Sequence, residues 1–170
     1  MKQQAIFLDR DGVINEERGE YTYLIEDFRF NDGVFTALQM FQEAGYLLIV
    51  ISNQGGIARG RYSRTDVDRL HRFMEKELLA KNIRLTEIYY CPHHSDLEKC
   101  LCRKPGTLML EKAMARFNID PVRSYFIGDH KRDAEAAIKA GIKPITIQPN
   151  QPLTEIVGQI LSGFQNSRTD

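Results

Sequence analysis

The chain has 170 residues, of which 42% are hydrophobic, and this length and composition suit a single globular domain spanning residues 1–170. Lys plus Arg and Asp plus Glu both number 23, so no net charge favours nucleic acid or an acidic membrane surface as a partner. No apolar run reaches the roughly 18 residues of a membrane span, and the first strand begins too early for a leader, so we expect a cytoplasmic protein.

The first predicted strand ends in two acidic residues. The apolar run of residues 5–8 is typical of a buried strand, and Asp9 and Asp11 follow it, with Gly12 as a turn signal. Ligands of open α/β sheets bind at the carboxyl ends of the strands. Both carboxylates are therefore predicted at the mouth of a crevice. The alternative is that they only cap the following turn, where Asp is common.

A polar connection of residues 15–31 follows, which is long for a loop between a strand and a helix. Beside the end of a strand, such a loop is expected to act as a lid or to contact the substrate. The alternative is a small hairpin packed on the edge, which the alternating residues 28–30 would suit.

The rest of the chain alternates strands and helices. Apolar spacing and cap signals predict helices over residues 33–44, 64–81, 107–117, 131–140 and 153–161. Short apolar runs predict buried strands over residues 46–51, 88–90, 125–127 and 144–147. A frayed polar tail is expected over residues 162–170. This alternation predicts an α/β fold, with helices on both faces of a parallel sheet.

Polar groups of different kinds follow these strands. The second strand leads to Ser52 and Asn53 in a glycine-rich turn, the third leads to Lys104, and the fourth leads to Asp129. A phosphate ester needs such a mixture, because a carboxylate can attack phosphorus, Mg²⁺ prefers oxygen ligands, and a lysine with loop amides can hold phosphoryl oxygens. The turn of residues 55–60 lacks the Lys-Ser/Thr of a nucleotide-binding loop, which excludes nucleoside triphosphates.

Cysteine and histidine residues crowd into one short segment. Cys91 with His93, and Cys100 with Cys102, form two pairs whose members are one residue apart. Three thiolates and one imidazole make a complete tetrahedral set for a structural Zn²⁺. A closed, zinc-stabilised loop is therefore predicted. The alternatives are His94 in place of His93, or three unligated thiols.

In combination, these residues resemble the four motifs of the haloacid dehalogenase (HAD) superfamily of phosphatases. The motifs are Asp9-Arg10-Asp11-Gly12-Val13, Ser52, Lys104 and residues 128–133, in this order and each at a predicted strand end. The resemblance implies a Rossmann-like three-layer α/β/α fold with a central parallel sheet of order 3-2-1-4-5. It also implies that there is no large cap domain, with residues 91–102 as a zinc-binding loop.

The resemblance also implies what each residue does. Asp9 would be the nucleophile, and Asp11 would protonate the leaving alcohol and then activate water against the phosphoenzyme. Mg²⁺ would be held by Asp9, Asp129 and the backbone carbonyl of Asp11. Ser52 and Lys104 would stabilise the phosphoryl group.

Further residues are expected to bind the substrate, namely Arg10, Asn53, Gln54, Gly55 and Arg103. The last of these follows from the resemblance, in which the arginine before the motif lysine contributes to recognition. Asp133 is expected to position the metal site or to cap a helix. His71, within a predicted helix, is expected at the surface or at the edge of the core.

Within the superfamily, the chain resembles the branch of heptose bisphosphate and histidinol phosphate phosphatases. Residues 55–60 are closer to the heptose enzymes, whereas the short loop between His93 and Cys100 favours the histidinol enzymes. His130 stands where a lysine is usual, and residues 16–21 depart from the family pattern.

The expected function is Mg²⁺-dependent hydrolysis of a small phosphate ester by a monomer. The first candidate substrate is the 7-phosphate of D-glycero-D-manno-heptose 1,7-bisphosphate, and the alternative is histidinol phosphate or another small phosphomonoester. A non-catalytic, metal-stabilised binding module is the competing class, and the complete set of catalytic groups argues against it.

Overall fold

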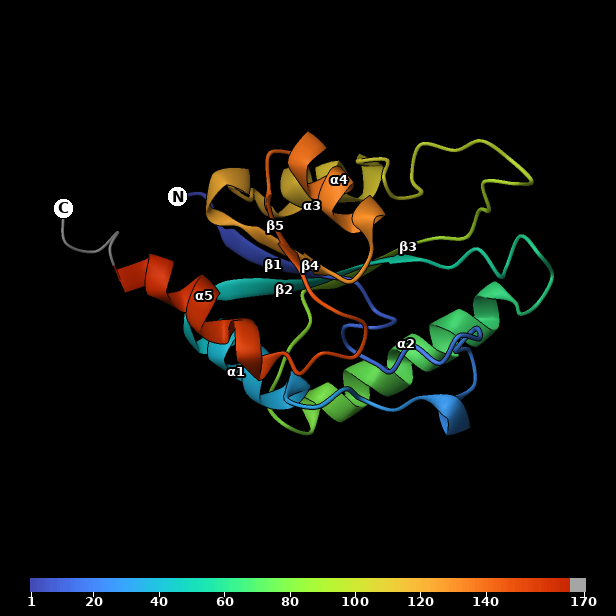
Figure 1. Cartoon of the computed structure of the whole chain (residues 1–170), viewed down its shortest axis with the longest axis horizontal. Helices are drawn as coiled ribbons and strands as arrows, with labels where there is room; N and C mark the ends of the chain where they lie inside the picture. Colours follow the sequence, from blue (N-terminus) through green and yellow to red (C-terminus); the bar gives the residue numbers. More distant parts are fainter. Residues whose placement is uncertain (166–170) are drawn as a thin grey trace.

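A computed structural model describes residues 1–165 of the chain, and its centre is a parallel sheet of five strands (Figure 1). The strand order is β3-β2-β1-β4-β5, which confirms the predicted topology. The strands are β1 (Gln4–Leu8), β2 (Tyr46–Asn53), β3 (Glu87–Cys91), β4 (Tyr125–Gly128) and β5 (Lys143–Thr146).

Two groups of helices cover the two faces of the sheet. Figure 1 shows α1, α2 and α5 on one face and α3 and α4 on the other, which confirms the three layers. The helices are α1 (Val34–Glu43), α2 (Arg64–Leu79), α3 (Leu108–Phe117), α4 (Lys131–Lys139) and α5 (Thr154–Gln165). None of these helices is long and apolar enough to cross a membrane, as far as the described residues go.

Some element ends differ from the prediction. Helix α2 ends at Leu79 rather than at residue 81, before a left-handed turn at Asn82 (φ 61°), a conformation that asparagine tolerates. Helix α5 continues to Gln165, past the predicted end at residue 161. The Ser and Gly that follow residue 161 have low helix propensity, but propensity alone does not end a helix. The remainder of the predicted tail, residues 166–170, lies outside the described residues.

Strands β2 and β3 run further than predicted, and this difference bears on the site. Ser52 pairs with Tyr90, and Asn53 pairs with Cys91, within the parallel ladder. These residues are therefore held by the sheet itself and do not belong to the loops that follow it.

The sheet buries both of its faces. All five residues of β1 are buried, with Ile6 and Leu8 in the core beneath α1, α2 and α5, and Ala5 and Phe7 in the core beneath α3 and α4. This division follows from the alternation of side chains along a strand. Because β1 lies at the centre, its carboxyl end delivers the following residues to the middle of the sheet edge.

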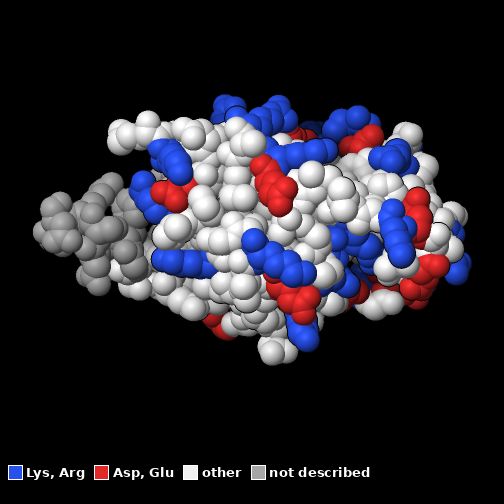
Figure 2. All heavy atoms as spheres, turned by 90° about the horizontal axis from the view of Figure 1, so that it is seen from above, with Lys and Arg blue, Asp and Glu red and all other residues white. Residues whose placement is uncertain are grey.

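The long connection after β1 forms neither a cap domain nor a full hairpin. It contains one short 3₁₀ helix, η1 (Ile25–Asp27), and one antiparallel bridge, between Asn15 and Phe30. On the face of the molecule that carries α3 and α4, Lys and Arg side chains cover more of the surface than Asp and Glu, with the acidic side chains lying among them (Figure 2).

Candidate active site

A polar cavity of about 240 Å³ opens at the carboxyl ends of β1, β2 and β4. Asp9 and Asp11 reach it from β1, Asn53 from β2, and His130 from the turn after β4. The other wall comes from the long connection after β1. The sheet therefore brings together the strand ends that the sequence singled out, as expected for an open α/β fold.

Asp9 and Lys104 form a buried ion pair at the base of the cavity. Lys104 Nζ lies 3.0 Å from Asp9 Oδ1 and 2.8 Å from Asp133 Oδ1, and it donates a hydrogen bond to the carbonyl of Ile51. Burial raises the pKa of Asp9 to about 7, although the charge of Lys104 opposes the shift. A fixed cation beside a carboxylate is the arrangement needed to bring a phosphoryl group to that carboxylate.

The carboxylate of Asp11 accepts hydrogen bonds from three neighbouring side chains, those of Arg10, Asn15 and Gln54. Oδ1 accepts from Arg10 Nη2 at 2.9 Å and from Asn15 Nδ2 at 3.0 Å, and Oδ2 accepts from Arg10 Nη2 and Gln54 Nε2, each at 3.1 Å. Burial alone would raise the pKa of Asp11, but the charge of Arg10 and these hydrogen bonds outweigh it and lower the pKa. The arrangement favours the ionised carboxylate, the form that can accept a proton from water.

Carboxylates at the ends of β1 and β4 form a cluster that fits a divalent cation. Ligand atoms of Asp9, Asp129, His130 and Asp133 lie within 4.8 Å of one another. Asp129 Oδ2 is buried without a hydrogen-bond partner, which suits a cation ligand. Gly12 makes room for it, because a Cβ at this position would lie 2.1 Å from Asp129 Oδ2 and φ is +81°.

Asp133 caps helix α4, which is one of the two roles expected for it. Its Oδ2 accepts a hydrogen bond from the backbone N–H of His130, which caps α4, and its Oδ1 faces Lys104. His130 in turn places Nδ1 2.7 Å from Asp129 Oδ1. The residue that replaces the usual lysine therefore contacts a candidate metal ligand and lines the cavity.

The cysteine cluster has the geometry of a four-ligand metal site. Cys91 Sγ lies 3.1 Å from Cys102 Sγ and 3.7 Å from Cys100 Sγ, and His93 Nδ1 lies 3.2 Å from Cys102 Sγ. Bonds of about 2.3 Å to sulfur and about 2.0 Å to nitrogen place tetrahedral ligand atoms roughly 3.5–3.8 Å apart, so the cluster could hold Zn²⁺. His94 lies apart from it and lines the cavity instead.

The residues predicted to bind substrate divide into two groups. Asn53, Gln54, Gly55 and Arg103 line the cavity. The side chain of Arg10 is fully buried beneath the cavity, where it contacts His71 and Thr22 and does not line the cavity wall. Its guanidinium therefore supports neighbouring residues of the site. Among the residues predicted to hold the phosphoryl group, Ser52 and Lys104 are buried below the cavity.

His71 is buried, so of the two places predicted for it, the surface is wrong. It is 6% exposed, and its Nε2 faces Arg10 Nη1 at 3.3 Å. Burial, followed by the charge of Arg10, lowers the pKa of His71 to about 3. The apolar periodicity of α2 does include position 71, but a histidine there does not reveal its buried partner.

Other cavity residues were not singled out from the sequence. The connection of residues 15–31 was expected to act as a lid or to contact the substrate, and Glu17, Glu20 and Tyr21 within it line the cavity. Tyr62 and Arg132 also line it. Arg132 lies within the motif of residues 128–133 but was given no role there, and no motif signals Tyr62. Both come from segments next to helix starts, where sequence alone does not fix the direction of a side chain.

Comparison with known proteins agrees with this geometry. The family described as HAD-hydrolase-like matches residues 101–150. D-glycero-alpha-D-manno-heptose-1,7-bisphosphate 7-phosphatase of Campylobacter jejuni is 47% identical over 142 residues, which cover 84% of this chain and 80% of that protein. The beta-anomer counterpart of Haemophilus influenzae is 41% identical, with coverage of 89% and 85%.

A solved structure shares the fold. The D,D-heptose 1,7-bisphosphate phosphatase of B. bronchiseptica, complexed with magnesium and phosphate, superposes with a TM-score of 0.82 at 28% sequence identity. The match covers 92% of this chain and 87% of that one. The similarity thus extends over both the sheet and the segments that surround the cavity.

Proposed function

Because the chain belongs to the HAD-like family of the heptose bisphosphate phosphatases, a family of phosphoric monoester hydrolases, we propose that it removes the 7-phosphate of D-glycero-D-manno-heptose 1,7-bisphosphate. The observation that carries the proposal is the buried contact between Asp9 and Lys104 beside the carboxylate of Asp129. This contact brings a nucleophile, a cation and a metal ligand together at one site, as phosphoryl transfer requires.

The proposed reaction has two steps. The Asp9 carboxylate attacks phosphorus, and the P–O bond to the sugar breaks. Asp11, which takes up a proton when the negative phosphate is bound beside it, gives that proton to the leaving alkoxide. Asp11, now ionised, takes a proton from a water molecule that attacks the aspartyl phosphate. This second attack releases inorganic phosphate and restores Asp9. The net reaction converts ester and water to alcohol and phosphate.

Lys104 and Ser52 support both steps from beneath. The ammonium of Lys104 would contact the developing phosphoryl charge while it stays fixed by Asp133 and the carbonyl of Ile51. Ser52 would do so through its hydroxyl, which already accepts a hydrogen bond from Gln54 Nε2 at 2.8 Å. Such fixed groups need little reorganisation during the reaction.

Two metal ions belong to the proposal. Asp9, Asp129 and the carbonyl of Asp11 would hold Mg²⁺, and Cys91, His93, Cys100 and Cys102 would hold Zn²⁺. Bound Mg²⁺ supplies positive charge that screens the nucleophile from the phosphate dianion. The zinc cluster would have a structural part, which is to hold the segment that carries Arg103 and Lys104.

A bisphosphate is favoured over a monoester by the cations of the cavity. Arg103 and Arg132 both line it, and no ion pair of either is found among the described residues. Guanidinium groups suit phosphate recognition, and two of them exceed what the reacting phosphate needs once Lys104 is counted.

Histidinol phosphate remains the second candidate, because the stretch between His93 and Cys100 is as short as in the histidinol enzymes. Release of phosphate should be measured for both anomers of the heptose bisphosphate and for histidinol phosphate. We expect the largest kcat/KM for one heptose anomer. A preference for histidinol phosphate would overturn the proposed substrate.

Asp9→Asn tests the nucleophile within the same assay. We expect loss of turnover at unchanged thermal stability, because Lys104 keeps Asp133 as its partner. Activity retained by this variant would overturn the chemistry.

We further propose one domain, a monomer and a cytoplasmic location. Sedimentation of the purified protein checks the monomer.

A further inference from the structure

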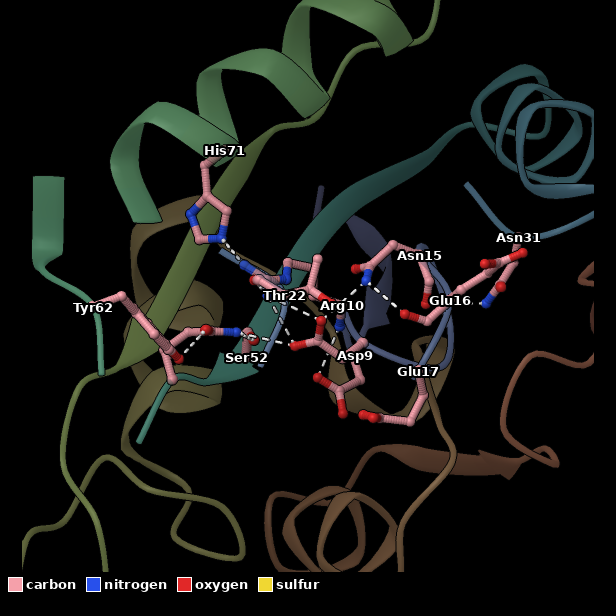
Figure 3. A network of polar contacts seen from close by, with 12 residues as sticks. Asp9, Arg10, Asn15, Glu16, Glu17, Thr22, Asn31, Ser52, Tyr62 and His71 are labelled. Atoms are coloured by element: carbon pink, nitrogen blue, oxygen red, sulfur yellow. Dashed lines mark hydrogen bonds and ion pairs between the residues drawn. The ribbon is translucent and has the colours of Figure 1, made fainter. Parts of the chain in front are cut away.

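A buried arginine, Arg10, joins Asp11 to the backbone of Thr22, which lies in the segment of residues 21–23 at the rim of the cavity. Arg10 is fully buried, and its Nη2 donates to both carboxylate oxygens of Asp11 and to the carbonyl of Thr22, the last at 2.6 Å. Its Nη1 donates to His71 Nε2, which must be the acceptor because a guanidinium has no acceptor atom. Figure 3 shows Arg10 beside Thr22 and His71. The position of Asp11 therefore depends on the main chain of the rim.

A second, separate chain of contacts reaches the same carboxylate. Gln54 Nε2 donates to Asp11 Oδ2, and Gln54 Oε1 accepts from the hydroxyl of Tyr62 at 2.8 Å. The ring of Tyr62 stacks on Tyr23, with centroids 5.0 Å apart and an interplanar angle of 15°. It also meets Tyr21 edge-on at 5.5 Å. Tyr21 and Tyr23 flank Thr22, so both routes begin in the same rim segment, residues 21–23.

Tyr62 is held in place closely. It is 8% exposed, and a Cβ at position 56 would lie 2.2 Å from its ring, so only glycine there leaves room for it. The amide of Gln54 is also fixed at its other contact, where it donates to Ser52 Oγ. Because Tyr62 and Gln54 are both held in place, a movement of the rim segment that shifts Tyr62 would also shift Gln54 and its contact with Asp11.

We infer that Arg10 and Tyr62 are positioning residues that couple the rim segment, residues 21–23, to the orientation of Asp11. Tyr21 and Thr22 line the cavity, so a substrate seated there contacts the rim segment directly. The two routes then carry that contact to the carboxylate that protonates the leaving alcohol. The inference rests on the proposed function, since it needs Asp11 as the acid and base.

The test compares two phosphate esters that differ in their need for an acid. An alkyl ester such as the heptose bisphosphate must receive a proton as it leaves, whereas p-nitrophenyl phosphate releases a weakly basic phenolate. For Tyr62→Phe, which removes one hydroxyl and keeps the ring, we expect kcat/KM to fall about 3- to 10-fold for the alkyl ester and less for the aryl ester. Arg10→Lys should show a larger difference of the same sign.

Tyr90→Phe is the matched control, because it removes a tyrosine hydroxyl bonded to Asp68 away from the cavity. We expect it to leave both rates unchanged. Equal losses for the two esters in Tyr62→Phe, or no loss, would overturn the inference. Wild-type protein without activity on either ester would overturn the proposed function, and the inference with it, so the two failures are distinguishable.

Tyr23→Leu tests the link to the rim, since it removes the ring that stacks on Tyr62. Combined with Tyr62→Phe, it should lower the alkyl-ester rate by less than the product of the two single effects. Multiplicative losses would separate the rim from Asp11 and overturn the coupling.

Discussion

The ammonium of Lys104 lies 3.0 Å from Asp9 Oδ1, and both side chains are almost fully buried. Lys104→Met removes the only cation that forms ion pairs with Asp9 and Asp133 among the described residues. Leaving two buried carboxylates without a partner should lower the free energy of unfolding by about 3–5 kcal/mol and abolish turnover. Urea denaturation and a phosphate-release assay measure the two effects.

Lys131→Met provides the comparison for Lys104→Met. The side chain of Lys131 is 90% exposed, with Nζ 3.6 Å from Glu135. Its loss should change the free energy of unfolding by no more than about 0.5 kcal/mol. Equal effects of the two substitutions would show that the buried pair has no special energetic importance.

Arg132 should distinguish a bisphosphate from a monoester. Arg132→Ala removes a cavity guanidinium whose Nε is buried without a hydrogen-bond partner. We expect kcat/KM for the heptose bisphosphate to fall about 10- to 100-fold, in line with a charged hydrogen bond, and that for p-nitrophenyl phosphate to change far less. Lys131→Ala, one residue earlier on the same helix, should alter neither. Similar losses on both esters would place Arg132 at the reacting phosphate.

The cysteine cluster predicts a metal stoichiometry. Purified protein should contain about one equivalent of zinc, and Cys100→Ser should lose it and lower the melting temperature by several degrees. Elemental analysis and thermal unfolding make the measurement. Ser95→Ala, an exposed change in the same loop, should keep both the zinc and the melting temperature. A folded protein free of metal, with all three thiols reactive, would contradict the zinc site.

His71 predicts a pH dependence of stability. Its pKa is lowered to about 3, so below the ordinary value of 6.5 the unfolded chain binds a proton that the native protein does not. The stabilisation is therefore complete above pH 6.5 and is lost as the pH falls toward 3. His71→Gln should make the decline shallower by up to about 1.4 kcal/mol per pH unit. Arg72→Gln, exposed on the same helix, should leave the slope unchanged.

The sequence is most informative where local pattern and sheet geometry agree. Asp9 and Asp129 follow short apolar runs, and parallel strands bring such ends to one edge, so their meeting could be anticipated. The ligand types of the cysteine segment similarly restrict its geometry. In both cases a short-range pattern determines a long-range contact.

Arg10 shows where this reasoning stops. Arg10 was expected to bind the substrate, whereas its side chain is fully buried, which is uncommon for a charged residue. Its burial depends on an acceptor from α2 and on a carbonyl of the rim, neither of which a local pattern specifies. Tyr62 is similar, because its position depends on the space left by Gly56 and on the stack with Tyr23.

The register of β2 and β3 has a consequence for sequence change. Asn53 pairs with Cys91 in the ladder, and its side chain accepts from the N–H of Lys104 at 3.0 Å and donates to the Lys104 carbonyl at 3.2 Å. The stretch from Cys91 to Lys104 thus starts and finishes beside one asparagine. Insertions or deletions between His93 and Cys100 leave the contacts of Asn53 with Cys91 and Lys104 in place. The surface loop between His93 and Cys100 can therefore change in length, in evolution or by grafting a peptide, without displacing Lys104.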